Sequence, residues 1–211
     1  IKEYFGTIPS GEAFPPLTIR DPEPAGEKRF IVKRKDAPNL MTIAFKTPEV
    51  GHPRLFALDI AEGVLNGRSG RLYKRLVEEE KLAVSVRAAN SPNKYVSEFS
   101  ISVQLRPDAS LEKAEKIIWE ELERLKNEPV SLREFQKVKN NSYASIVRSL
   151  RDMENVATML AWYEIFGDYK IFLSWAEKLD SVSVENVQEA AKETFKKELS
   201  VNGILLGTQG E

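Results

Sequence analysis

The segment SEFSISVQL, from Ser97 to Leu105, alternates between polar and apolar side chains. Successive side chains of a strand point to opposite faces of a sheet, so this alternation is typical of an antiparallel strand with one buried face. The apolar positions are Phe99, Ile101, Val103 and Leu105. The segment therefore predicts a sheet that is covered on one face and open on the other.

Further strands are predicted on both sides of this segment. They are apolar, partly β-branched runs bounded by turn residues. The loop Asn90 to Asn93 supplies turn residues for a hairpin with the strand before it, and Asp36 to Asn39 supplies a turn between the first two strands. The predicted strands are Phe30 to Lys33, Leu40 to Lys46, Ala83 to Ala88 and Leu199 to Leu206.

Apolar residues at helical spacing predict helices between the strands. Ser110 is a good N-cap for one helix, and Ser131 with Glu134 forms a capping box that opens another. The other predicted helices are His52 to Leu65, Ser69 to about Glu80, Met153 to a stop at Gly167, Phe172 to Leu179, and Val184 to Phe195. The order β-β-α-α-β-β, a helical block and a final strand predicts an α+β fold with helices on one face of a largely antiparallel sheet.

The composition limits the possible partners. The chain has 211 residues, of which 42% are hydrophobic and 30% charged, enough for one sizeable core. With 31 basic and 32 acidic residues the net charge is -1, so no global field favours nucleic acid or an anionic membrane. No apolar run reaches the roughly 18 residues of a membrane span. We expect a soluble protein, and with no cysteine both periplasm and cytoplasm stay possible.

The first residues differ from the rest. Ile1 to Gly6 have the pattern of a last helical turn, with Gly6 as its stop. Residues 8–26 contain five prolines, which disfavour a helix interior or a central strand. We therefore expect residues 1–25 to be the end of a preceding domain and an interdomain linker, and 26–211 to be a C-terminal domain.

No catalytic constellation is found in the sequence. The single histidine, His52, lies beside Pro53 at a predicted helix start without a nucleophile motif nearby, which favours a capping or surface role. One histidine and no cysteine exclude a zinc site with two histidines inside this chain. The segment Asn66 to Arg71 lacks the Lys-Ser/Thr ending of a P-loop and follows a helix, so a junction between two helices is preferred to a phosphate cradle.

Five segments, in order along the chain, resemble those of zinc peptidases of the pitrilysin and mitochondrial processing peptidase type, in particular bacterial members. Ile1 to Gly11 is similar to the end of that family's first domain and the start of its linker. The other segments are Leu65 to Val77 (LNGRSGRLYKRLV), Glu78 to Val86 (EEEKLAVSV), Asn155 to Asp168 (NVATMLAWYEIFGD) and Ser181 to Ala191 (SVSVENVQEAA). The chain resembles the C-terminal, non-zinc-binding half of such a peptidase.

The resemblance implies a mechanism divided between two domains. The first domain binds zinc through an inverted H-x-x-E-H helix and a distal Glu, and the second closes a chamber over the peptide. In many members the second domain also supplies an Arg and, seven residues later, a Tyr that stabilise the scissile carbonyl. These two positions are Val77 and Val84 here, and valine has no donor. On helical geometry Arg75 faces away from Val77, and Tyr73 lies about one turn, roughly 6 Å, behind it, so neither replaces the pair.

The resemblance further implies a substrate chamber walled by the turn and strand around these positions. No catalytic residue and no metal ligand is predicted in the chain. The predicted wall residues are Gly67, Ser69, Arg71, Tyr73, Ala83 and Ser85.

Two classes of function stay open. In the first, the chain is the non-catalytic clamp or lid half of a zinc metallopeptidase that acts on unstructured peptides. Zinc is then expected in an N-terminal domain of the same parent chain or in a homologous partner subunit, and not in this fragment. In the second, the parent has no peptidase activity and is a structural or partner-binding subunit. An H-x-x-E-H motif in the roughly 200 residues before Ile1 would select the first class.

The ligand inventory predicts that the purified 211-residue chain contains no stoichiometric zinc, because tight sites need several paired ligands. Elemental analysis after dialysis against a chelator measures this. About one retained zinc ion per chain would contradict the assignment.

Overall fold

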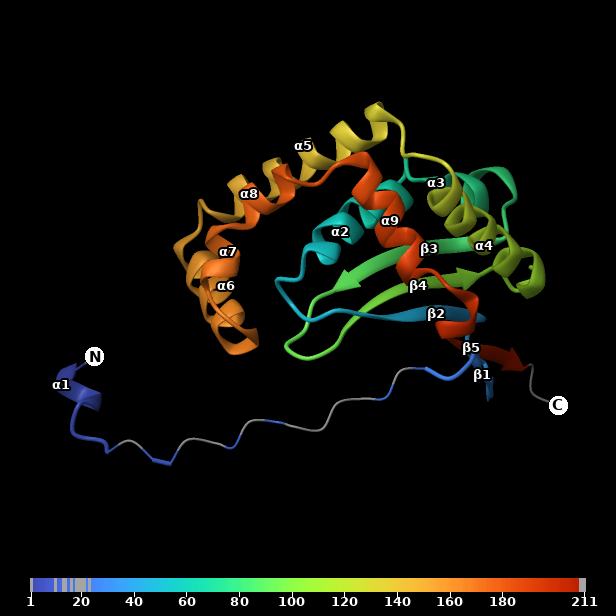
Figure 1. Cartoon of the computed structure of the whole chain (residues 1–211). Helices are drawn as coiled ribbons and strands as arrows, with labels where there is room; N and C mark the ends of the chain where they lie inside the picture. The colour runs from blue at the N-terminus through green and yellow to red at the C-terminus, as the bar shows by residue number, and fades with distance from the viewer. Residues whose placement is uncertain are drawn as a thin grey trace.

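Figure 1 shows the computed structural model of the chain, which describes residues 2–9, 11–12, 15, 17, 22 and 24–208. Its described strands form one sheet in the order β1-β5-β2-β4-β3. The β1–β5 pair is parallel and the other pairs are antiparallel, which confirms the predicted α+β class. The strands are β1 (Lys28–Lys35), β2 (Leu40–Thr47), β3 (Ala83–Ser91), β4 (Ser97–Leu105) and β5 (Ser200–Thr208).

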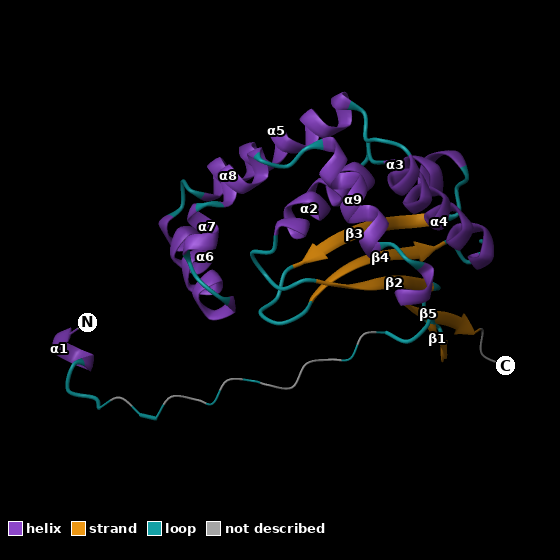
Figure 2. Ribbon diagram, viewed as in Figure 1, coloured by secondary structure: helices purple, strands orange, loops and turns teal. Residues whose placement is uncertain are grey.

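Helices cover one face of this sheet, as Figure 2 shows. Over the sheet lie α2 (Pro53–Leu65), α4 (Leu111–Asn127) and α9 (Val184–Thr194). An arc of helices extends from them past one end of the sheet: α5 (Leu132–Ser149), α6 (Met153–Phe166), α7 (Lys170–Leu173) and α8 (Trp175–Asp180). The short elements are α1 (Lys2–Phe5), α3 (Arg71–Tyr73), the π-helix η1 (Lys74–Glu79) and the 3₁₀ helix η2 (Lys197–Leu199).

The predicted caps are confirmed. Ser110 Oγ accepts from the backbone N of Lys113, and Ser131 with Glu134 makes the complete capping box of α5. His52 caps α2, because its Nδ1 accepts from the N–H of Arg54 at 3.1 Å. Part of the predicted linker, residues 10, 13–14, 16, 18–21 and 23, and Ile1 in the predicted helical turn lie outside the described residues.

The strands β1 and β2 are joined by the predicted turn, yet they are not neighbours, because β5 lies between them. The turn passes over the end of β5: Asp36 N donates to Thr208 O at 3.1 Å, and Gly207 N donates to Asn39 Oδ1 at 2.9 Å. A Cβ on Gly207 would lie 1.9 Å from Ala37 O, so the close approach requires glycine. Local sequence patterns do not specify which distant strand enters a sheet, and this arrangement was not predicted.

The core lies between the sheet and α2, α4 and α9. The alternating residues of β4 that were predicted to be apolar and inward, such as Phe99 and Ile101, are fully buried. Phe195, just after α9, packs edge-on against Phe45 of β2 and Phe99 of β4, with ring centroids 5.3 and 4.9 Å apart. Such aromatic pairs add about 0.5–1.5 kcal/mol each beyond area burial and fix α9 on the sheet.

The opposite face of the sheet has no described helix against it. Its central part is polar, and Thr42 Oγ1 of β2 and Ser102 Oγ of β4 lie 3.0 Å apart in a hydrogen bond across the strands. Towards β1 the face becomes apolar. There the ring of Phe30 lies over Gly203 of β5, since a Cβ at Gly203 would come within 2.9 Å of Phe30 Cζ.

The outer edge of β3 is covered by side chains of α2 and its C-cap. The amide of Asn66 pairs with both backbone groups of Ala88: Nδ2 donates to Ala88 O at 2.6 Å, and Oδ1 accepts from Ala88 N at 2.8 Å. Glu62 Oε2 accepts from the backbone N of Asn90 at 3.0 Å. An edge strand otherwise presents such groups to another chain. At Ala88 and Asn90, β3 is therefore closed to an added strand.

The side chain of Asn90 extends this network to Asp59 of α2. Asn90 Nδ2 donates to Asp59 Oδ1 at 2.7 Å and to Leu55 O at 3.0 Å. Burial raises the pKa of Asp59 to about 7; the hydrogen bond from Asn90 opposes this rise, and the charge of Glu62 adds to it. Between about pH 4 and 7 the folded protein thus binds a proton that the unfolded chain has released, so this group lowers stability as the pH rises through that window.

We predict that Asp59→Asn stabilises the protein at pH 8 and leaves its stability at pH 4 nearly unchanged. The amide oxygen can still accept from Asn90, while the cost of a buried charge is removed. The expected gain at pH 8 is about 2–4 kcal/mol, since one pKa unit corresponds to about 1.4 kcal/mol. Urea denaturation across this pH range measures it.

The matched control is Asp108→Asn, which removes an exposed carboxylate from the loop after β4. Its pH profile should follow the wild type. If the free energies of unfolding of Asp59→Asn and of the wild type kept a constant difference from pH 4 to 8, Asp59 would be ionised throughout this range. The raised pKa of Asp59 would then be wrong.

Candidate functional site

The junction between α2 and β3 contains the residues that the sequence singled out. Asn66 ends α2, and Gly67 follows with φ +77°, a left-handed backbone that favours glycine. Gly70 is also required, because its Cβ would lie 2.2 Å from Asn66 O. The turn therefore forms for steric reasons, and the structure supports its interpretation as a junction of two helices.

The predicted wall residues divide into exposed and buried ones. Gly67, Ser69 and Ser85 are exposed, and Tyr73 is half-buried. The side chains of Arg71 and Ala83 are buried. Arg71 and Ala83 therefore pack beneath the junction, and only the other four residues contribute to its surface.

Arg71 links the junction to α5. Its Nε and Nη2 donate to the two carboxylate oxygens of Glu134 at 2.8 and 2.9 Å. This hydrogen bond, helped by the Ser131 side chain, lowers the pKa of Glu134 to about 2. The same carboxylate completes the capping box of α5, so one group fixes both the helix start and the junction. Nearby, Lys137 Nζ donates to Ser69 Oγ at 3.0 Å.

Val77 lies in a π-helix. The predicted helix from Ser69 to about Glu80 is present but changes after Tyr73 into the π-turn Lys74–Glu79, where Glu80 N donates to Arg75 O at 3.0 Å. Val77 is half-buried against the core. Single π-turns inside helices occur frequently at functional sites. Nothing in the periodicity of the sequence predicted this widening.

Val84 is the extra residue of a β-bulge. The pairing of β3 with β4 shifts register between Ala83 and Ser85, and the Val84 side chain is 53% exposed. A bulge re-aims a side chain, and bulges are over-represented next to active sites. Val77 and Val84, which the resemblance implies as the positions of the family's Arg and Tyr, thus both lie in irregular backbone, and neither carries a hydrogen-bond donor.

The two neighbouring candidates for the pair, Arg75 and Tyr73, lie just before Val77 in the chain. Arg75 donates to Glu120 at 2.8 Å and to Glu121 at 3.2 Å, both on α4, so its guanidinium is already engaged there. This agrees with the expectation that it faces away from Val77. Tyr73 is half-buried one turn before Val77.

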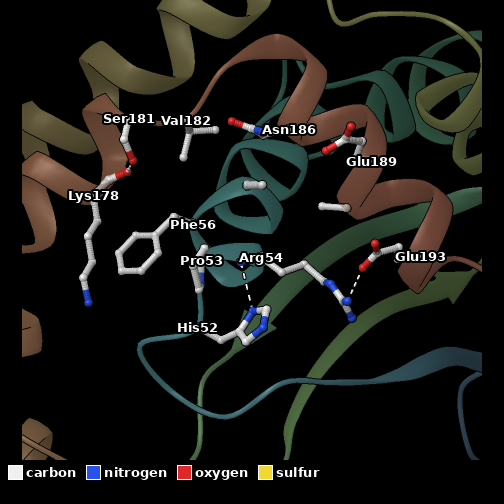
Figure 3. A pocket seen from close by; sticks show the side chains of 12 residues that line it. His52, Pro53, Arg54, Phe56, Lys178, Ser181, Val182, Asn186, Glu189 and Glu193 are labelled. Carbon is white, nitrogen blue, oxygen red and sulfur yellow. Dashed lines mark hydrogen bonds and ion pairs between the residues drawn. The ribbon is translucent and has the colours of Figure 1, made fainter.

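A separate pocket of about 390 Å³ lies among the N-terminus of α2, α8 and α9, as Figure 3 shows. Two of its charged side chains are engaged: Arg54 forms an ion pair with Glu193, and Lys178 Nζ lies 5.5 Å from the centre of the Phe56 ring. His52 at its edge is the cap of α2. The hydroxyl in its lining, Ser181 Oγ, donates to the backbone Lys178 O at 2.7 Å, so the polar groups His52 and Ser181 both serve the ends of helices.

Among residues 24–208 and the shorter described stretches, no group of three or more His, Cys, Asp or Glu side chains could hold a metal ion. Zinc chemistry thus has no ligand set in the described chain. In the same residues, no helix is both long and apolar enough to cross a bilayer.

Comparison with known proteins gives consistent results. The chain is 26% identical over 200 residues to the zinc protease PqqE of Helicobacter pylori, covering 92% of this chain and 45% of that protein. It is 26% identical over 205 residues to the uncharacterized zinc protease YmxG of Bacillus subtilis, covering 95% and 49%. The chain thus spans about half the length of these relatives.

Solved structures share the fold. A protease from Helicobacter pylori superposes with a TM-score of 0.91 at 24% identity, covering 97% of this chain and 50% of that one. An inactive peptidase domain from Bordetella parapertussis gives a TM-score of 0.75 at 24% identity, covering 85% of this chain and 96% of that one. A domain of this size has therefore been crystallised by itself.

The family described as "Peptidase M16 inactive domain" matches residues 1–142, about two thirds of the sequence. Because this match covers more than half of the chain, the protein belongs to that family of inactive peptidase domains.

Proposed function

We propose that this chain is the non-catalytic half of a zinc metallopeptidase and closes a chamber over an unstructured peptide. The observation that carries the proposal is the family match of an inactive peptidase domain that spans only about half of its zinc protease relatives. Peptide hydrolysis would then take place at a zinc site in a preceding domain of the parent chain or in a homologous partner subunit.

The open face of the sheet is the proposed chamber wall. It is polar at its centre, where the hydroxyls of Thr42 and Ser102 hydrogen-bond to each other. The other candidate wall residues lie at the junction, where Gly67, Ser69 and Ser85 are exposed and Tyr73 is half-buried. A surface of this kind can confine a peptide without binding it tightly, which suits a lid.

Because Val77 and Val84 have no hydrogen-bond donor, the donors that stabilise the oxyanion would have to come from another chain. Val77 and Val84 occupy backbone positions that would present side chains, but neither can stabilise a developing oxyanion. In the proposed enzyme a partner subunit contributes these donors. The same observation also supports the second candidate, a structural or partner-binding subunit without peptidase activity, and the full-length parent discriminates between the two.

We predict that combining Val77→Arg with Val84→Tyr in the full-length, zinc-loaded parent raises peptide hydrolysis at least tenfold when no partner subunit is present. One oxyanion donor typically stabilises the transition state by about 2–4 kcal/mol. The tenfold threshold is smaller than the effect of one ideal donor, so it allows for imperfect geometry at either position. Hydrolysis of a quenched fluorescent peptide measures the rate.

The matched control is Val77→Leu with Val84→Phe, which adds volume without a donor and should leave the rate unchanged. Thermal denaturation and zinc content check that both double mutants are intact. An unchanged rate in a folded, zinc-loaded Arg–Tyr variant would contradict the proposed role of these positions, and a parent that binds no zinc would favour the structural subunit.

We also predict that neutral unstructured peptides bind the isolated chain no more tightly than roughly millimolar at β3, because association must offset several kcal/mol of lost freedom. Asn66 and Glu62 already occupy the β3 edge at Ala88 and Asn90. Amide chemical shifts of Ala83 to Ala88 should stay unchanged in a peptide titration. Micromolar binding mapped to these amides would assign β3 as an independent peptide site and overturn the lid.

A further inference from the structure

The two edges of the sheet differ in what covers them. Side chains from α2 and its cap close β3, whereas β1 at the opposite edge pairs only with β5 among the described strands. All eight residues of β1, Lys28–Lys35, are exposed. As Figure 1 shows, β1 lies at the far side of the sheet from β3. Its outer backbone groups thus have no partner strand in the described chain.

β1 concentrates positive charge. The strand KRFIVKRK has five basic residues in a protein whose net charge is -1. Arg29 is neutralised by Glu115 of α4 through two hydrogen bonds of 2.8 Å. In the described residues Lys28, Lys33, Arg34 and Lys35 form no ion pair. Four cationic side chains therefore flank an open strand edge.

The centre of β1 is apolar. Phe30, Ile31 and Val32 are 55, 54 and 52% exposed, an unusual arrangement for three consecutive large apolar residues. Phe30 leans over Gly203 of β5, which directs its ring towards the sheet and leaves the outer edge of β1 clear. β-branched and aromatic residues on a free edge favour pairing with another strand.

Edge strands are often protected by charge, and lysines and arginines on β1 could serve that purpose alone. Protection, however, works when charges interrupt the apolar run. Here they lie at both ends and leave the Phe30–Val32 centre uninterrupted. Basic residues at both ends repel a basic strand and attract an acidic one. The charges of β1 therefore select the partner strand and do not prevent pairing altogether.

A second copy of β1 is the partner that the charges repel. In an antiparallel pair of two β1 strands centred on Ile31 and Val32, Arg29 faces Arg34 and Lys28 faces Lys35. In a parallel in-register pair every basic residue faces its own copy. Like charges directly opposite are destabilising, so self-pairing of β1 is disfavoured in both directions.

We propose that β1 is a docking edge for an acidic, extended segment of a partner protein, which adds to the sheet as a strand beside β1. Main-chain hydrogen bonds to the free edge would supply affinity, and side chains at alternate positions would supply specificity. Acidic residues in the added strand lie near Lys28 and Lys33 to Lys35, and apolar residues lie beside Phe30 to Val32. The proposal goes beyond the lid function and does not depend on zinc in the parent.

The test uses the 211-residue chain and a fluorescent nine-residue peptide that has Glu or Asp at the three positions of each end and Val or Ile at its three central positions. We expect saturable binding by fluorescence anisotropy, at least tenfold weaker when ionic strength rises from about 0.05 to 0.3 M, since exposed charges are screened over that range. A peptide with Lys in place of every acidic residue should not bind. Equal binding of the two peptides would overturn the proposal.

Two variants locate the site. Lys33→Glu with Arg34→Glu should weaken binding at least tenfold, because two attractive charges become repulsive. The matched control, Lys192→Glu with Lys196→Glu, reverses two exposed lysines in and just after α9 and should leave binding unchanged. Equal losses in both variants would mean that only net charge matters, and would overturn a site at β1.

A third peptide tests strand addition itself. N-methylation at every second residue along one edge of the acidic peptide removes its hydrogen bonds to β1 but keeps its charge. We expect this peptide to lose binding and the unmodified one to shift the amide resonances of Lys28–Lys35. Equal binding of the N-methylated peptide would contradict strand addition and indicate a charged surface instead. A dimer that forms without peptide and is abolished by Lys33→Glu would indicate that β1 is an interface between two copies of this chain.

Discussion

The insertion of β5 between β1 and β2 is the constraint on which the other features depend. β5 pairs with β1 from Val201 to Thr208 and with β2 from Ser200 to Leu205. The turn that passes over Gly207 leaves no room for any other residue at that position. α9 leads into β5, and Phe195 fixes the end of α9 between Phe45 and Phe99. Strands from the two ends of the chain must therefore meet before the sheet is complete, a non-local arrangement that slows folding. The insertion also makes β1 and β3 the two edges.

The two edge strands differ in whether side chains cover their outer backbone groups. At β3, an asparagine amide takes the place of a neighbouring strand, and a carboxylate buried enough for its pKa to be raised completes the cover. Burial of carboxyl groups beside each other is costly. The network at Asp59, Glu62 and Asn90 thus fixes α2 on β3 with some loss of stability at neutral pH. No comparable cover lies on β1 in the described residues.

Much of the fold could be predicted because its signals are local. The alternation in β4 gave a strand with the predicted bounds, and the Ser131–Glu134 pair gave the start of α5, since each depends on neighbouring residues alone. The strand order could not be predicted, because it depends on contacts between the two ends of the chain. The Asn66–Ala88 pairing was missed for a related reason: Asn66 before Gly67 was interpreted only as a helix stop, and its second role requires the position of β3.

In the candidate site too, some features could be predicted from the sequence and others depend on contacts between distant residues. Sequence similarity pointed to Val77 and Val84, but not to the π-turn and the bulge in which they lie. Both irregularities are fixed by buried neighbours: Leu76 precedes Val77 with no exposed surface and its carbonyl accepts from Leu82 N, while Ala83 is fully buried before Val84. A change of side chain at the exposed Val84 therefore need not disturb the backbone, whereas Val77 also packs against the core. Packing behind a surface position can thus maintain its backbone geometry without depending on the side chain that the position presents.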